Sequence, residues 1–364
     1  MAITIKNQAE AVELVRRLVE IESPTEDVAA CRDVVEEANK IVTELLGSPG
    51  EVRDIKGYPT LSWKSGSPRV LLLCHLDTVW PKGSFTPKWS VEGDRLRGPG
   101  VYDMKAGFIQ AAMAIAALEE RDGIHLLATS DEETGSAASR ELIEMSAKEC
   151  EFALVFESAI DGKVKTARKG TSMYRIKVIG KAAHAGLEPE KGINAMIVLA
   201  SLLPKITVIA DMSVGTSVTP TTFHAGTTLN TIPAEAILEI DVRAFSTAEQ
   251  ERVDASIKAL AGNVDGATVE VSGGINRPAM DPKMSASLYE VAKEAAQAVG
   301  IVDLKDAAVG GASDGNFTAA VGTATLDGLG AVGDGAHANH EWVSAAALLE
   351  RSGMVTEMLR RLLK

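Results

Sequence analysis

The segment HLDTVW, residues 75–80, follows an apolar run, RVLLLC, and places an imidazole and a carboxylate two residues apart. On an extended chain, residues two apart point to the same side, so His75 and Asp77 would face one spot. A histidine that binds a metal ion is commonly held in place by a carboxylate behind it. We therefore expect His75 to bind a metal ion and Asp77 to orient its ring, although a histidine at a strand end is more often only a hydrogen-bonded structural residue.

Further acids and imidazoles occur at the ends of other expected strands and helices. They are Asp103 in GPGVYDMKAG, Asp131, Glu132 and Glu133 in SDEETG, Glu157 in FALVFE, and His337 and His340 in GDGAHANHEW. Ligands of open α/β sheets bind at the carboxyl ends of the strands, so we expect these side chains to converge. Imidazoles and carboxylates without a cysteine suit zinc or a similar divalent ion. Because the donors outnumber what one tetrahedral ion needs, the sequence predicts two ions bridged by one carboxylate.

The adjacent acids Glu132 and Glu133 would point to opposite sides at a strand end. One can then bind a metal ion while the other accepts a proton from water as a general base. Simpler interpretations exist, because an acidic pair in a turn is commonly solvated, Asp103 before a helix can be an N-cap, and Glu157 can be a buried ion-pair partner. The coincidence of metal-binding residue types at so many element ends favours a shared site.

These side chains need a framework that brings them together. The continuous apolar runs at 69–75, 124–130 and 152–157 suit strands that are covered on both faces. Helices are expected at 8–22, 26–46, 104–120, 284–299 and 343–363. The pattern predicts an α/β domain with a mostly parallel sheet flanked by helices.

The pattern changes near residue 168. Strand-like TSMYRIKVIG, TSVTPTTFHAG, EAILEIDVRAF and ATVEVSG are interleaved with helical INAMIVLASLLPKI and TAEQERVDASIKALAG. This strand-helix-strand-strand-helix-strand order is that of a ferredoxin-like α+β domain. We therefore expect residues 168–278 to form a domain inserted into the α/β domain, which would comprise residues 1–167 and 279–364.

Composition narrows the class of protein. A chain of 364 residues favours two domains, and a net charge of −13 argues against a nucleic-acid partner. No stretch approaches the ~20 apolar residues of a membrane helix, and the N-terminal stretch is typical of an amphipathic helix rather than a signal peptide. Three widely spaced cysteines predict no disulfide framework, which indicates a reducing cytoplasm.

Two further segments have alternative interpretations. GLGAVG, residues 328–333, matches GxGxxG, but no helix follows it as a dinucleotide fingerprint requires. We interpret it as a flexible loop that presents His337. The basic run GKVKTARKG, residues 162–170, can recognise an acidic substrate group or form a solvated hinge.

Together the motifs resemble a known family. HLDTVW, GPGVYDMKAG, SDEETGS, VFES, RKG, KAAHAG, LNTIPAEAILEIDVR and HANHE are similar to those of the co-catalytic zinc family of acetylornithine deacetylase, succinyl-diaminopimelate desuccinylase, aminoacylase and the bacterial glutamate carboxypeptidases. The resemblance covers nearly the whole chain. HLDTVWP and RGPGVYDMKAG look most like the glutamate carboxypeptidase branch.

The resemblance implies a role for individual residues. One zinc ion would be held by His75, Asp103 and Glu157, and the other by Asp103, Glu133 and His337, with Co²⁺ or Mn²⁺ as possible substitutes. The spacing to Glu341 favours His337 over His340. Glu132 would be the general base and Asp77 the partner of His75. The inserted domain would form a homodimer, in which His184 binds the substrate carbonyl of the partner chain, Arg243 binds the substrate carboxylate, and Asn230 makes an accompanying polar contact.

The expected activity is hydrolysis of an amide bond next to a free carboxylate, which releases a C-terminal amino acid such as glutamate from a small peptide. The alternative within the class is an N-acyl-amino-acid deacylase, which shares every metal residue. A non-catalytic or dinucleotide-binding protein is the alternative from another class. The presence of Glu132 beside a full ligand set argues against a non-catalytic protein. The missing helix after GLGAVG argues against a dinucleotide-binding protein.

Overall fold

The computed structural model describes residues 7–364, which divide into two units. The first unit comprises the described residues up to Ala167 together with Pro282–Ala308 and Ser313–Lys364, and the second comprises Arg168–Asp281 and Val309–Ala312. The segment predicted as an insertion, 168–278, lies wholly within the second unit. No helix among residues 7–364 is both long and apolar enough to cross a bilayer.

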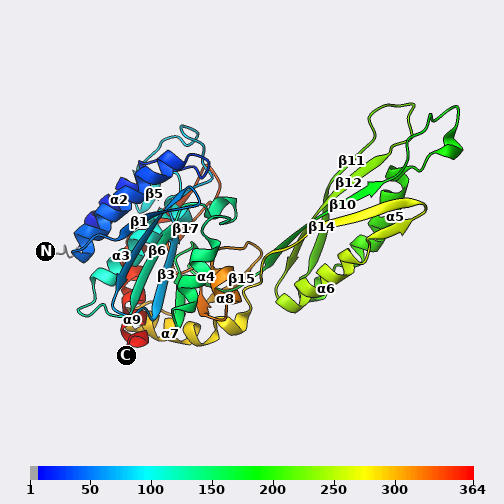
Figure 1. Ribbon diagram of the computed structural model, residues 1–364. Coiled ribbons are helices and arrows are strands. Elements are labelled where there is room, and N and C mark those ends of the chain that lie inside the picture. Colours follow the sequence, from blue (N-terminus) through cyan, green and yellow to red (C-terminus); the bar gives the residue numbers. More distant parts are fainter. Residues whose placement is uncertain (1–6) are drawn as a thin grey trace. The chain divides into compact units, whose positions relative to one another are not determined.

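The first unit is built on a six-stranded sheet (Figure 1). Across the sheet the strands are β1 (Glu51–Ile55), β2 (Tyr58–Ser65), β6 (Ile124–Thr129), β3 (Val70–His75), β7 (Phe152–Val155) and β16 (Ala324–Leu326). The last four run parallel to one another, whereas β1 and β2 add an antiparallel edge. The predicted mostly parallel sheet is therefore confirmed, and its three central strands are the three apolar runs of the sequence.

Helices cover both faces of this sheet. One face packs on α1 (Gln8–Val19), α2 (Val28–Leu46), α3 (Ala106–Ala116), α7 (Ala286–Ala298) and α9 (Ala345–Leu362), and the other packs on α4 (Arg140–Lys148) and α8 (Gly315–Ala320). Within β3, Leu72 and Cys74 join the first core, and Leu71 and Leu73 join the second. Because alternate residues of a strand point to opposite faces, burial on both sides explains why this strand is apolar throughout.

A second, smaller sheet completes the first unit. Its strands, in order, are β4 (Ser90–Glu92), β5 (Arg95–Arg97), β18 (Trp342–Ser344), β17 (Val332–Asp334) and β8 (Ala159–Ile160). A separate pair is formed by β9 (Val164–Arg168) and β15 (Asp306–Val309). The short helices are η1 (Val101–Lys105), η2 (Glu132–Thr134) and η5 (Pro282–Met284), and η3 (Pro189–Lys191) and η4 (Met212–Val214) in the second unit.

Two sequence interpretations are corrected here. GLGAVG is not a flexible loop, because Leu329 and Gly330 are held by hydrogen bonds from their backbone N–H groups to the carbonyls of Val155 and Glu157. A Cβ atom at Gly330 would collide with the backbone beside it, so glycine permits this close approach. In the basic run, Lys165 and Arg168 are 7% and 4% exposed, so the solvated-hinge interpretation is wrong for both.

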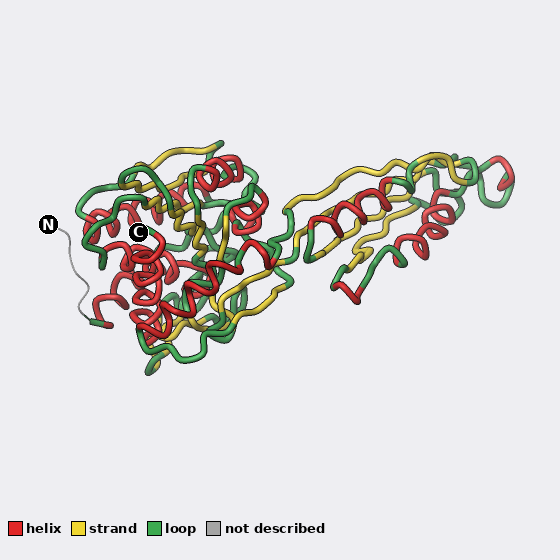
Figure 2. Tube along the Cα trace, turned by 90° about the horizontal axis from the view of Figure 1, so that it is seen from below, coloured by secondary structure: helices red, strands yellow, loops and turns green. Residues whose placement is uncertain are grey.

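The second unit is a five-stranded antiparallel sheet with helices on one face. The strand order is β11 (Ser217–Ala225), β12 (Glu235–Ala244), β10 (Gly170–Ile179), β14 (Ala267–Arg277) and β13 (Gly262–Val264). Two helices, α5 (Ala195–Thr207) and α6 (Thr247–Lys258), pack on it around an apolar core (Figure 2). The predicted ferredoxin-like order is confirmed. The other face carries charged pairs such as Arg175–Glu239 and Arg243–Asp241.

Candidate active site

Three neighbouring parallel strands of the first unit end in ligand-type residues. Strand β3 ends at His75, β6 leads into Glu132 and Glu133, and β7 leads into Glu157. The order β6-β3-β7 makes these strands adjacent, and their parallel direction puts their carboxyl ends at one edge of the sheet. The convergence expected from the sequence therefore follows from strand order.

Asp103 lies between two imidazoles. Its Oδ1 atom is 3.4 Å from Nε2 of His75, and its Oδ2 atom is 3.3 Å from Nε2 of His337. It lies in the irregular turn η1 with φ −121° and ψ 90°, and α3 begins only at Ala106, later than predicted. The N-cap position of α3 belongs to Lys105, so the N-cap interpretation of Asp103 is wrong.

A second carboxylate accompanies each imidazole. Oε1 of Glu157 is 3.6 Å from Nε2 of His75, and Oε2 of Glu133 is 3.1 Å from Nε2 of His337. The donors thus form two groups that share Asp103. His337, rather than the alternative His340, is the histidine of the C-terminal motif that meets these carboxylates in the described part of the chain.

The donor atoms fit a divalent ion. At zinc–ligand distances of about 2.0–2.2 Å, two donors of one tetrahedral ion lie about 3.3–3.6 Å apart. The spacings of 3.4, 3.6 and 3.3 Å lie in this range, and the 3.1 Å between Glu133 and His337 is slightly shorter. One donor atom each from His75, Asp103 and Glu133 also lies within 4.8 Å of the others. Oε1 of Glu133 is buried and makes no hydrogen bond to residues 7–364, as expected of an oxygen reserved for a cation.

Asp77 lies behind His75, on the side away from Asp103. Its Oδ1 atom is 3.4 Å from Nδ1 of His75, and its Oδ2 atom accepts hydrogen bonds from the Thr25 hydroxyl at 2.7 Å and the Glu133 backbone N–H at 3.1 Å. Asp77 is fully buried. Nδ1 of His75 hydrogen-bonds to the backbone carbonyl of Asp77 at 3.1 Å, so Asp77 links the ring of His75 through its carbonyl to the turn of Glu133 through its carboxylate.

Glu132 and Glu133 belong to the single helical turn η2 rather than to an extended strand end. The prediction that alternation along a strand separates their side chains is therefore wrong in its geometry. Glu132 is 9% exposed, and its charge contributes to the raised pKa values of His75 and Glu133, which places its carboxylate near the cluster.

The electrostatics of the cluster show a surplus of acids. Burial disfavours a charged ring at His75, but hydrogen bonds to Asp103 and Asp77 raise its pKa well above the ordinary value. Hydrogen bonds to Asp103 and Glu133 raise the pKa of His337 to about 10. Burial raises the pKa of Glu133 to about 8. The carboxylates stabilise positive charge on both rings, which is the environment that a divalent cation requires.

Sequence reasoning overlooked the role of Glu341, which served only as a spacing reference for His337. Glu341 is fully buried and accepts four hydrogen bonds, from the indole of Trp80 and the backbone N–H groups of Gly100, Tyr102 and Asp103. Burial raises its pKa to about 7. The available signal was its place four residues after His337 in HANHE, but nothing in the sequence indicates which N–H groups it meets.

The remaining predicted site residues lie in the second unit. The loop of His184 pairs with that of Asn230, since the Ala185 backbone N–H donates to the Asn230 carbonyl at 2.9 Å. Nδ1 of His184 accepts hydrogen bonds from the backbone N–H groups of Gly186 and Leu187. A ring nitrogen that accepts carries no proton, so Nε2 carries the proton of the neutral ring.

Arg243 is far from this loop pair. Asn230 precedes the first residue of β12, Glu235, and Arg243 is near the last, so the strand separates them by roughly 25 Å. Nε and one terminal nitrogen of Arg243 form a two-pronged pair with Asp241 at 2.9 Å. The structure therefore brings His184 and Asn230 together within the unit and leaves Arg243 apart.

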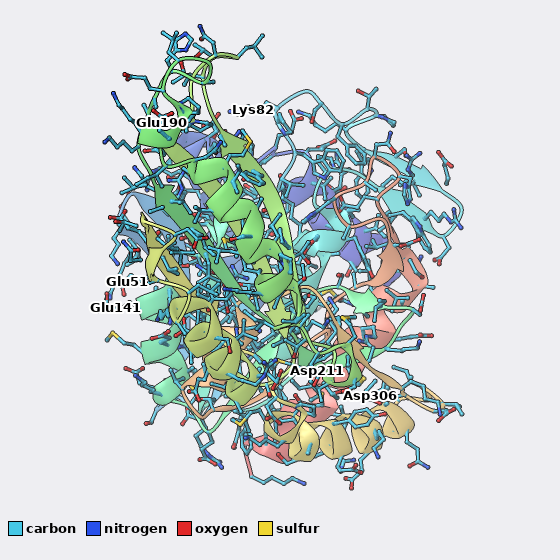
Figure 3. All side chains as sticks on the ribbon, turned by 90° about the vertical axis from the view of Figure 1, so that its right-hand side faces the viewer. Glu51, Lys82, Glu141, Glu190, Asp211 and Asp306 are labelled. Carbon is cyan, nitrogen blue, oxygen red and sulfur yellow. The ribbon has the colours of Figure 1, made fainter. Side chains whose placement is uncertain are left out.

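A cavity of about 680 Å³ adjoins the cluster in the first unit. Its wall includes Glu133 and Thr25, the residue whose hydroxyl donates to Asp77. Lys82, labelled in Figure 3, also lines it and is ion-paired with Asp27 at 2.7 Å. The apolar part of the wall comes from Pro24, Val28, Val79 and Pro81. A small-molecule substrate fits a space of this size.

Residues 71–361 match peptidase family M20/M25/M40. The chain belongs to this family. It is 33% identical over 313 residues to carboxypeptidase G2 of Pseudomonas sp. (strain RS-16), and the matched region covers 81% of this chain and 74% of that protein. It is 26% identical to the succinyl-diaminopimelate desuccinylase of Thioalkalivibrio sulfidiphilus over 98% of this chain and 99% of that protein.

Solved structures share the fold of this M20/M25/M40 chain. The aminopeptidase PepT of Bacillus cereus has a TM-score of 0.77 and 22% sequence identity, covering 98% of this chain and 99% of that one. The family resemblance drawn from the motifs is thereby confirmed, and the chain is a hydrolase of the metallopeptidase and amidohydrolase class.

Proposed function

We propose that this M20/M25/M40 enzyme uses two divalent ions to cleave an amide bond next to a free carboxylate, releasing a C-terminal amino acid. The observation that carries the proposal is the position of Asp103, whose two oxygens face two different imidazoles. A carboxylate in that position suits a bridge between two ions. The similarity to a protein named carboxypeptidase G2 supports the choice of bond.

His75, Asp103 and Glu157 would hold one ion, and Asp103, Glu133 and His337 the other. Zinc suits this nitrogen and oxygen donor set, with cobalt or manganese as substitutes. Bound there, the ions would polarise the scissile carbonyl and lower the pKa of water. Asp77 would hold the ring of His75 through Nδ1 and so keep Nε2 directed at Asp103.

Glu132 would move the proton. It lies in the same turn as Glu133 and close enough to influence the charges of the cluster. Its carboxylate would take a proton from the attacking water and later give one to the nitrogen of the leaving amine. Because Glu132 would bind no ion in this scheme, its role in proton transfer is separable from metal binding.

His184 would stabilise the oxyanion that forms on the substrate carbonyl. Its Nδ1 atom is occupied by two backbone donors, which leaves Nε2–H as the donor. Asn230, on the loop paired with that of His184, would add a polar contact. Arg243 would bind the substrate carboxylate through a terminal nitrogen while Asp241 fixes its orientation.

His184 and Arg243 can serve one substrate only if two chains contribute. A dipeptide spans about 7 Å, much less than the length of β12 that separates them. We therefore place His184 and Asn230 of one chain at the active site of a partner, in a homodimer formed through the second unit. The first unit would be catalytic, and the second would serve dimerisation and substrate binding. Edge strands β11 and β13 offer unpaired backbone groups for such an assembly.

A substrate panel tests the proposed activity. Purified, zinc-loaded enzyme is assayed with dipeptides that end in glutamate or in an apolar residue, with N-acetyl and N-succinyl amino acids, and with the C-terminally amidated form of each. We expect hydrolysis of peptides with a free carboxylate and none of their amidated forms. Activity confined to N-acyl amino acids would instead establish the alternative deacylase, and equal activity on amidated substrates would refute the carboxylate requirement.

A further inference from the structure

The carboxylate of Glu341 connects three segments that carry ligand-type residues. Oε1 accepts hydrogen bonds from the backbone N–H groups of Tyr102 at 2.8 Å and Asp103 at 3.1 Å. Oε2 accepts from the Gly100 backbone N–H at 3.1 Å and the Trp80 indole N–H at 3.0 Å. Trp80 belongs to the segment after His75, the three backbone donors belong to the turn around Asp103, and Glu341 itself belongs to the segment after His337.

The turn that carries Asp103 lacks the internal hydrogen bonds of a regular helix. Gly100 has φ +70°, and Asp103 and Met104 both leave the helical region. The backbone N–H of Lys105 reaches the Gly100 carbonyl, but those of Tyr102 and Asp103 find their acceptor in Glu341. Buried N–H groups need an acceptor, so the conformation that aims Asp103 between the two imidazoles depends on this carboxylate.

Glu341 is itself held firmly. It directly precedes β18, where Trp342 pairs with Arg97 on one side and Asp334 on the other. Its own backbone N–H donates to the Ala338 carbonyl at 2.9 Å and closes the turn that directly follows His337, whereas the turn that contains His337 is closed by the Ala338 backbone N–H on the Gly335 carbonyl at 2.8 Å. Glu341 therefore links the turn of Asp103 to the segment directly after His337, and the side chains of Asp103 and His337 meet at 3.3 Å.

We infer that Glu341 is a positioning residue for metal binding, which holds Asp103 so that its two oxygens serve both ions at once. The inference rests on the proposed two-ion site. An ionised carboxylate offers acceptors only and matches all four donors. In Glu341→Gln an amide NH₂ replaces one oxygen and faces two N–H donors, so half of the contacts are lost with almost no change in size.

The test is metal binding by the metal-free full-length protein. Cobalt titration followed by calorimetry and visible absorption gives affinity, stoichiometry and ligand geometry. We expect Glu341→Gln to bind cobalt about 10–100-fold more weakly than the wild type, with an altered absorption band. Excess metal should restore kcat while KM stays close to that of the wild type. Wild-type affinity and spectrum in a variant that has lost only thermal stability would overturn the inference.

Asp94→Asn is the matched control. Asp94 accepts hydrogen bonds from the Ala346 backbone N–H and the Ser344 hydroxyl, at the other end of β18 from Glu341. This variant should lose stability and keep its cobalt affinity. An equal loss of affinity in Asp94→Asn would attribute the effect to the small sheet in general and overturn the specific role of Glu341.

A second variant keeps the inference testable if Glu341→Gln does not fold. Trp80→Phe removes one donor and keeps an aromatic ring that can pack on Phe85, whose ring lies 5.0 Å from that of Trp80. We expect a several-fold loss of cobalt affinity, and unchanged affinity would overturn the inference. A wild-type protein that binds no second ion would instead refute the two-ion site of the proposed function, so the two failures are distinguishable.

Discussion

The two units position their polar residues in opposite ways. In the first unit, parallel strands β3, β6 and β7 deliver His75, Glu133 and Glu157 to one edge of the sheet. In the second unit, the single strand β12 has Asn230 just before its beginning and Arg243 near its end. Parallel strands gather residues from distant parts of the sequence, whereas one strand keeps its two ends apart.

Burial differs between the two regions as well. His75 and Asp77 are almost inaccessible to solvent, whereas His184 and Asn230 are exposed and Arg243 is half-buried. Of the five proposed ligands His337 is exposed and the other four are largely buried, and a donor set of this kind fits a metal centre that forms within one chain. Exposed polar residues at the two ends of one strand fit contacts that are completed only when substrate and a partner bind. The predictions below test this division of roles.

The largest expected effect comes from Glu132→Gln. Removal of the proposed proton carrier should lower kcat by about 10²–10⁴-fold, while metal content remains that of the wild type because no proposed ligand is lost. Steady-state kinetics and metal analysis of the same preparation measure both. Glu141→Gln, at an exposed position of helix α4, is the matched control and should be fully active. Loss of metal from Glu132→Gln would show that Glu132 and Glu133 have exchanged roles.

Mixed dimers test whether the second unit acts across chains. His184→Ala and Glu132→Gln homodimers should each be nearly inactive. A heterodimer of the two contains one site with its own Glu132 and the partner's intact His184, so activity should recover to at most half that of the wild type. Differently tagged, co-expressed chains provide the heterodimer. Heterodimers no more active than the parents, or a strictly monomeric wild type, would contradict the proposed exchange.

Arg243→Ala should raise KM for substrates with a free carboxylate by about 10–100-fold, because a charge-assisted hydrogen bond contributes about 1.5–3 kcal/mol. The control is Arg175→Ala, which removes a cation from the same face of the sheet, where Arg175 pairs with Glu239. KM values for substrates with a free and with an amidated C-terminus are measured for both variants, and only Arg243→Ala should show the increase for the free form. An unchanged KM in Arg243→Ala would leave the carboxylate to be bound elsewhere.

A smaller effect concerns stability in acid and distinguishes the units through His125. This residue is 1% exposed in the first unit, and burial lowers its pKa to about 3, whereas the histidines of the second unit, His184 and His224, are exposed. Below about pH 6.5 the unfolded chain binds a proton that folded His125 does not, so stability falls as pH drops toward 3.

Urea unfolding of chelator-treated protein at pH 7 and pH 5 measures this effect. Between pH 7 and pH 5 the free energy of unfolding of the wild type should fall by about 2 kcal/mol more than that of His125→Gln, which is the change expected when one histidine has its pKa lowered this far. The glutamine amide oxygen can still accept the Ser62 hydroxyl, which lies 2.9 Å from Nε2 of His125. Equal pH dependence in both proteins would show that another group controls acid stability.

The sequence predicted the parallel strands and the ligand-type residues because both are local patterns. An apolar run followed by His75 or Glu157 is visible in the chain itself, and strand order then brings the run ends together. Patterns that depend on tertiary contacts were not predicted. The antiparallel strand β1 is mostly exposed and has no apolar alternation, so it carries no strand signal.

The geometry of Asp103 and Glu132 could not be predicted for the same reason. The turn at Asp103 is shaped by hydrogen bonds to Glu341, which is 238 positions away in the chain, and periodicity contains no information about such a contact. Glu132 and Glu133 were expected to alternate as on a strand, but β6 ends at Thr129 and a helical turn follows. For Lys165 and Arg168 the sequence left a solvated hinge open as one of two alternatives, and it could not exclude it because burial of charge depends on tertiary packing.

The central claim is that one chain of this enzyme binds two ions through a shared Asp103. Metal-free protein is titrated with zinc or cobalt and analysed for metal per chain after removal of excess, alongside Asp103→Ala. We expect about two ions per wild-type chain, loss of activity on chelation and recovery on zinc addition, and near-complete loss of both ions in Asp103→Ala. A wild-type content that never exceeds one ion per chain, or an Asp103→Ala variant that still binds two, would contradict the account.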